Sequence, residues 1–181
     1  PSRLVVDLRG LSNAYPKIGP LVINEIMYHP PDIAIPGVIT NDDSLNEYIE
    51  ILNPTATTVP LYDPVNYGYA DGRTNTWRLR GQVDWNFPTN ITLAPGAYLL
   101  VVNFNPTNAA ASNAFCLKYS VPSGTRMFGP YSGKLSNSGG SVELYRPDTP
   151  QAPGRVDEGL VPYIWVDEVD YRDTGPWPTN V

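Results

Sequence analysis

Short apolar runs, interrupted every few residues by proline or glycine, constrain this chain more than any other feature. Of its 181 residues, 20 are Pro and 15 are Gly, and both residue types break regular backbone ladders. The runs between them are rich in Val, Ile, Thr and Tyr, which favour strands. Many short strands joined by Gly- and Pro-containing turns are typical of an antiparallel sandwich or barrel. Long helices are not expected.

The apolar pattern locates the elements. In EYIEIL, Ile49 and Ile51 alternate with polar neighbours, which predicts a half-buried strand, and in TWRLRG the arginines should face away from Trp77 and Leu79. In LVINEIMY the alternation fails around Asn24, which indicates a bulge. The run 98–102 is apolar on both faces and is expected in the centre of the sandwich, whereas 109–117 is the one stretch that suits a short helix after a polar cap. The strand candidates lie within 21–28, 47–52, 59–62, 76–81, 84–88, 91–102, 129–147 and 164–171.

The length and the 41% apolar content fit one domain with its own core. We assign residues 1–20 to an N-terminal extension or linker and residues 21–181 to a β-sandwich domain. The chain begins without Met and its first residues lack the order of a signal peptide, which suggests a piece of a longer polypeptide. No apolar run approaches the roughly 20 residues that a membrane span needs.

A resemblance to a known family runs through most of the chain. The following segments occur in this order between Leu21 and Trp177: LVINEIMYHPP, NEYIEILNPT, VPLYD, TWRLRGQVDWNFP, LAPGAYLLVV, GKLSNSGGSVELY and VDEVDYRDTGPWP. They resemble a bacterial lamin-tail domain. The resemblance implies an all-β, immunoglobulin-like antiparallel β-sandwich with long loops and at most one short helix, carried by a large exported or cell-surface bacterial protein. It implies no enzymatic machinery.

Two departures from the family pattern bear on the fold. The loop from Asn66 to Arg73 is longer than is usual in the family, and the strand that usually follows PWP is missing. An edge of the sheet is therefore unpaired, or it is filled by the N-terminal segment from Leu4 to Leu8.

Two glutamates in NEYIEILNP raise the question of a catalytic pair. A glycosidase needs two carboxylates about 5 to 10 Å apart across a cleft. Glu47 and Glu50 are three positions apart, so they point to opposite faces of a strand and do not form that pair. We expect Glu50 to be an exposed polar residue, and Glu25 and Glu47 to be more buried and to accept structural hydrogen bonds.

The loop NDDSLNE carries side-chain oxygens of the kind that calcium binds. Its spacing does not match an EF-hand, which needs Gly at its sixth position and Glu at its twelfth. Calcium held by Asp42, Asp43 and Glu47 remains an open alternative. With one His and one Cys in the chain, a zinc site of the usual type is excluded and no other cofactor is expected.

Nucleophilic catalysis has little support in the sequence. His29 is the one histidine, and the chain contains no G-x-S-x-G motif. Cys116 would need His29 beside it to be reactive, and a small buried apolar residue is the simpler expectation. We predict that the protein is not an enzyme.

Two binding hypotheses stand beside a purely structural role. Tyr67, Tyr69 and Trp85 lie in or near loops, and exposed aromatic rings stack on sugars, which predicts a carbohydrate-binding module. The formal charge of -6 disfavours nucleic acid. If the protein did bind DNA, the basic stripe would consist of Arg78, Arg80, Lys118, Arg126, Lys134 and Arg146.

Our main prediction is a non-catalytic structural, anchoring or interaction module that contacts other domains of its parent chain or other proteins.

Overall fold

The computed structural model describes residues 19–31 and 43–175. These residues form eleven strands, one α-helix and one short 3-10 helix. The elements are β1 (Val22–Met27), η1 (Ser44–Asn46), β2 (Tyr48–Leu52), β3 (Val59–Pro60), β4 (Arg78–Gly81), β5 (Val83–Asn86), β6 (Thr92–Leu93), β7 (Tyr98–Val102), α2 (Ala109–Tyr119), β8 (Arg126–Phe128), β9 (Ser132–Gly133), β10 (Gly139–Pro147) and β11 (Tyr163–Arg172).

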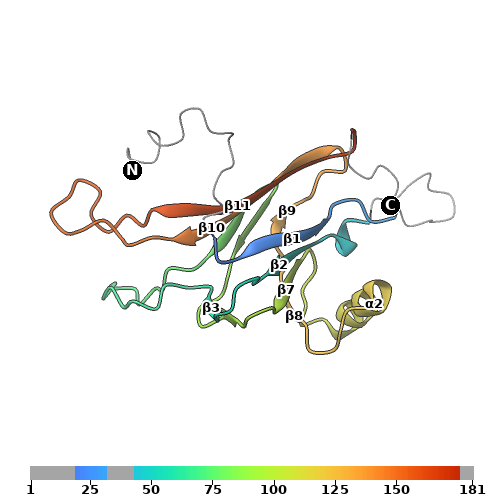
Figure 1. The fold of residues 1–181 in the computed structure, drawn as a ribbon, viewed down its shortest axis with the longest axis horizontal. Helices are drawn as coiled ribbons and strands as arrows, with labels where there is room; N and C mark the ends of the chain where they lie inside the picture. The colour runs from blue at the N-terminus through green and yellow to red at the C-terminus, as the bar shows by residue number, and fades with distance from the viewer. Residues whose placement is uncertain (1–18, 32–42, 176–181) are drawn as a thin grey trace.

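The strands form two main sheets that pack against each other (Figure 1). The first has the order β1-β2-β7-β8, the second has the order β11-β10-β4-β5-β9, and β3 pairs with β6 separately. Neighbouring strands are antiparallel except for β7 and β8, which are parallel. Parallel strands need a crossover connection, and α2 lies in the connection between β7 and β8. The prediction of an all-β, sandwich-like fold with one short helix is confirmed for the described residues.

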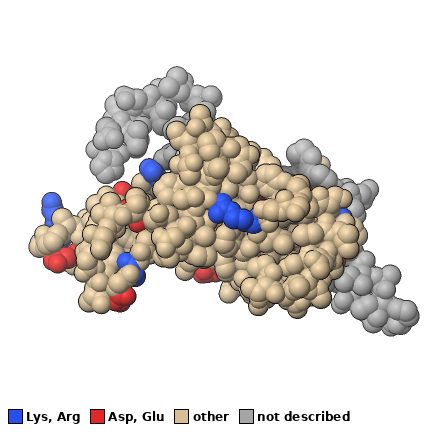
Figure 2. All heavy atoms as spheres, turned by 90° about the horizontal axis from the view of Figure 1, so that it is seen from below, with Lys and Arg blue, Asp and Glu red and all other residues tan. Residues whose placement is uncertain are grey.

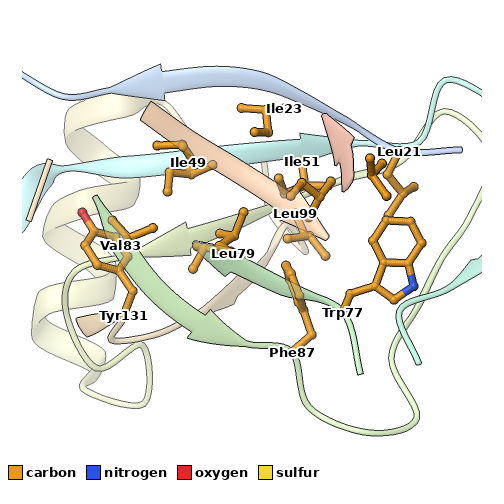
Figure 3. Packing of buried hydrophobic residues seen from close by; sticks show 14 of the residues in the cluster. Leu21, Ile23, Ile49, Ile51, Trp77, Leu79, Val83, Phe87, Leu99 and Tyr131 are labelled. Carbon is orange, nitrogen blue, oxygen red and sulfur yellow. The ribbon is translucent and has the colours of Figure 1, made fainter. Parts of the chain in front are cut away.

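The main core lies between the two sheets (Figure 3). Because alternate residues of a strand face opposite sides, β4 and the residue before it place Leu79 and Trp77 in this core and leave Arg78 and Arg80 outside, as predicted. The two sheets both contribute side chains that are fully buried: Ile49, Ile51 and Leu99 from the first and Leu79 and Leu144 from the second.

A second, smaller core lies on the outer face of the first sheet, under α2. It contains Tyr48, Leu100, Val102, Phe104 and Phe115. Both faces of β7 are therefore buried, as predicted. The prediction that β2 is half-buried was wrong on one side, because the ring of Tyr48 packs edge-on against Phe115 instead of facing water.

The predicted bulge in β1 is present. The register between β1 and β2 shifts between Ile23 and Glu25, and the backbone N–H of Ile23 donates to Oδ2 of Asp167 in β11 at 2.9 Å. This bond joins the two sheets at one edge. Residues 1–18, including the segment from Leu4 to Leu8, lie outside the described residues, as do the residues after Gly175.

Two long connections extend beyond the sheets at the end of the molecule opposite α2 (Figure 1). One comprises residues 63–75, between β3 and β4, and the other comprises residues 148–162, between β10 and β11. We call these two connections together the loop end. Their positions agree with the prediction of long loops.

Candidate functional site

Tyr67 and Tyr69 form an aromatic pair in the loop end. Their ring centroids are 5.8 Å apart and the rings are tilted by 44°. The Tyr67 hydroxyl donates to Oδ2 of Asp63 at 2.7 Å, and this hydrogen bond, with some desolvation, raises the pKa of Tyr67. Tyr69 accepts from Nδ2 of Asn75 at 3.1 Å, and the Arg73 guanidinium lies 4.1 Å from its ring centroid. Both rings are thus held by neighbours before any ligand arrives.

A groove of about 440 Å³ runs beside Tyr67. One wall comes from the first connection and includes Asp63 and Tyr67. The other comes from the end of β10, with Arg146, and from the start of the second connection, with Thr149. Trp77 lines the groove although it is 4% exposed, so it forms the floor. The remaining lining residues are Pro20, Thr57, Thr58, Val59, Pro60, Tyr62, Pro64, Val65, Pro147 and Asp148.

Trp85 does not belong to this group. It pairs with Leu79 in the β4–β5 register, so the two side chains share the inner face of the sheet. Trp85 is partly buried against the main core and does not line the groove. Of the three aromatic candidates, the structure brings Tyr67 and Tyr69 together and leaves Trp85 apart.

The calcium candidates have protein partners of their own. Asp43 is 2% exposed, and its Oδ2 lies 2.6 Å from the Lys118 ammonium of α2 and accepts from Asn46. Glu47 turns into the main core, and Asp42 lies outside the described residues. Within the ranges 19–31 and 43–175, no three His, Cys, Asp or Glu side chains are grouped so that they could hold a metal ion.

Glu47 is fully buried, as predicted. Its Oε2 accepts the Leu135 backbone N–H at 3.0 Å and the Tyr131 hydroxyl at 2.8 Å. Desolvation raises the pKa of Glu47, although these two hydrogen bonds oppose the shift. Its carboxylate therefore ties the loop after β9 to the start of β2, which is a structural task.

Glu25 and Glu50 are neighbours, which the sequence spacing did not predict. The β1–β2 register sets them opposite each other. Glu25 is exposed, so the prediction that it is more buried was wrong. It accepts from the Tyr48 hydroxyl at 2.6 Å, and Glu50 accepts from Asn24 at 2.6 Å. A small hollow beside β1 is lined by Glu25 but not by Glu50.

His29 borders an open hollow of about 580 Å³ that is also lined by Ser136, Ser138 and Asp173. No hydrogen bond joins His29 to a serine or to Asp173 in the part of the chain that the structure describes. Cys116 is half-buried on α2 and was predicted to be buried.

Three of the basic residues proposed for a DNA-binding stripe have protein partners. Arg80 pairs with Asp84 at 3.1 Å, Lys118 pairs with Asp43, and Arg78 stacks on Tyr163 with its Cζ 3.4 Å from the ring centroid. On the face drawn in Figure 2, Lys and Arg side chains are spread over the surface, and several lie beside Asp or Glu. The Arg78–Tyr163 stack was missed because it depends on the pairing of β4, β10 and β11.

The fold and the site define an all-β, sandwich-like domain with a groove at its loop end. A comparison with protein-family models finds no match to the sequence, and a comparison with curated proteins finds none either. None of the described helices has the length and apolar character needed to cross a membrane.

Proposed function

We propose that this domain is a non-catalytic interaction module that makes its contacts through the loop end. One observation carries the proposal: Val156 and Leu160, both in the connection between β10 and β11, are 109% and 59% exposed. Neither side chain fills the core, and exposed apolar surface that is contiguous commonly marks contact sites.

The buried acids support a role without chemistry of their own. Glu47 is engaged by Tyr131 and Leu135, and Asp167 accepts from the backbone of Ile23. In each case the carboxylate joins elements that are distant in sequence, as expected of groups that hold a sandwich together.

The family and the location are part of the same proposal. Strands occur within the segments LVINEIMYHPP, NEYIEILNPT, TWRLRGQVDWNFP and LAPGAYLLVV, in keeping with the resemblance to bacterial lamin-tail domains. On this proposal the domain anchors or spaces a large exported or cell-surface bacterial protein, and its partners are other domains or other proteins.

The test is sedimentation of the purified domain with isolated bacterial cell envelopes, before and after protease treatment of the envelopes. We expect saturable retention that falls about tenfold in the double variant Val156→Ser/Leu160→Ser, because the apolar contacts are lost. The matched control is Leu45→Ser/Leu117→Ser, which changes two exposed leucines at the α2 end and should bind as the wild type does. Absence of retention, or equal retention of the Val156→Ser/Leu160→Ser variant, would contradict the proposal.

Carbohydrate recognition is a second candidate, and the Tyr67–Tyr69 pair favours it. Two tilted, pre-positioned rings next to a groove provide the apolar surface on which sugar rings stack. In the sedimentation experiment, retention that survives protease treatment would favour this candidate over a protein partner.

A further inference from the structure

We propose that the groove between Tyr67 and Arg146 binds a neutral polysaccharide chain. The inference rests on the second candidate function, carbohydrate recognition. It adds the position of the ligand, its charge class and the residues that select it. None of the groove residues on the β10 side was predicted from the sequence as a sugar contact.

Tyr67 supplies the apolar platform. Its ring lines the groove and is partly exposed, and its hydroxyl is held by Asp63 at 2.7 Å. A ring that is fixed before binding loses little conformational freedom when a sugar stacks on it, so more of the contact energy is available for affinity.

Arg146 supplies a donor that the fold leaves unused. It lines the groove, and its buried Nε has no hydrogen-bond partner among the described residues. Nε itself is shielded from the groove, so a ligand oxygen would be bound by the terminal N–H groups of the half-buried guanidinium, which makes no hydrogen bond to another described residue. Sugar hydroxyls and ring oxygens are acceptors of this kind.

The opposite signs of charge in the lining select against a charged chain. Arg146 faces a groove that also contains Asp63 and Asp148, so neither a polyanion nor a polycation meets a complementary surface. The threonine hydroxyls at 57, 58 and 149 add neutral partners. A volume of about 440 Å³ lies within the common range for ligand sites, about 300 to 1,000 Å³.

The experiment is affinity electrophoresis of the whole chain through gels that contain laminarin, mannan, xylan or galactan, with polygalacturonate as the charged comparison. We expect retardation by at least one neutral polysaccharide. Tyr67→Ala and Arg146→Ala should each weaken that binding about tenfold, and Tyr67→Phe, which keeps the ring, should weaken it less than Tyr67→Ala. Trp165→Ala is the matched control, because Trp165 is 42% exposed and does not line the groove.

Urea unfolding of each variant separates a binding defect from a folding defect, and Tyr67→Phe keeps the test valid if Tyr67→Ala is unstable. The inference is overturned if no neutral polysaccharide binds, if only polygalacturonate binds, or if Trp165→Ala weakens binding as much as Tyr67→Ala does. Retention on envelopes that depends on Val156 and Leu160, without polysaccharide binding, would leave the proposed function standing while this inference fails.

Discussion

The sequence raised the question of whether Glu47 is catalytic, and its contacts indicate a structural role. Its carboxylate lies at the start of β2, receives two hydrogen bonds from Tyr131 and Leu135, and is shielded from water. Removing the acceptor leaves two buried donors without a partner. We expect Glu47→Ala to lower the free energy of unfolding by about 3 kcal/mol and Glu50→Ala, on a partly exposed face, by less than about 1 kcal/mol. Urea denaturation measures both.

The pH dependence of stability provides an independent check on Glu47. Burial raises the pKa of Glu47 in the folded state above its ordinary value of 4.5, so the folded state holds this proton more tightly than the unfolded state does. Its favourable contribution is therefore complete below pH 4.5 and is lost as the pH rises through the folded pKa. The stability of the wild type relative to Glu47→Gln should increase as the pH is lowered from neutral towards 4.5. A difference that does not change with pH would contradict this assignment.

At the scale of the element, α2 is held by its two ends and by one buried face. Asn108 caps the first turn by accepting from the backbone N–H of Ala110 and Ala111 at 3.1 and 3.2 Å. The helix ends at Ser120, which has a φ of 51°, a left-handed conformation that favours glycine. Phe115 is its buried residue.

Substitutions at the two ends of α2 should change the free energy of unfolding in opposite directions. Asn108→Ala should lower the free energy of unfolding by about 1 kcal/mol, because the cap is lost. Ser120→Gly should raise it by about 0.5 kcal/mol, because the strain of a side chain at positive φ is removed. Asn113→Ala, in the exposed middle of the helix, is the control and should not lower stability. Thermal unfolding followed by circular dichroism measures all three.

At the scale of the whole molecule, the two cores share strands. β7 points Leu99 and Val101 into the main core and Leu100 and Val102 into the core under α2. Damage to one core therefore reaches the other through the backbone of β7 and β2. We infer that the described part of the chain unfolds as one cooperative unit.

Two large-to-small variants test this coupling. Leu79→Ala in the main core and Phe115→Ala under α2 should each cost about 3 kcal/mol or more. In both variants the urea midpoints from tryptophan fluorescence and from circular dichroism should shift together. Leu117→Ala, which changes an exposed residue of the same helix (83% exposed), should leave both midpoints unchanged. If Phe115→Ala shifts the circular dichroism midpoint alone, the helix unfolds independently.

Features that depend on residues close in sequence were predicted correctly, whereas features that depend on contacts between distant segments were not. The bulge at Asn24 and the helix after Asn108 were predicted because broken alternation and capping involve residues close in sequence. The exposure of Glu25 and the burial of Tyr48 were not predicted, because each depends on what the first sheet packs against. The position of Arg146 in the groove was not predicted either, because Arg146 lies on β10, far along the chain from Tyr67.

The sequence by itself determined that the described part of the chain is all-β, where most of its strands lie and where α2 begins. Propensity, alternation and Gly or Pro breaks are local properties, so they can be read without knowing the fold. Only the tertiary structure decided that Glu25 faces Glu50, that Trp85 turns inward and that Tyr67 and Arg146 share a groove. Those facts depend on strand register and on packing between distant segments, which local pattern does not encode.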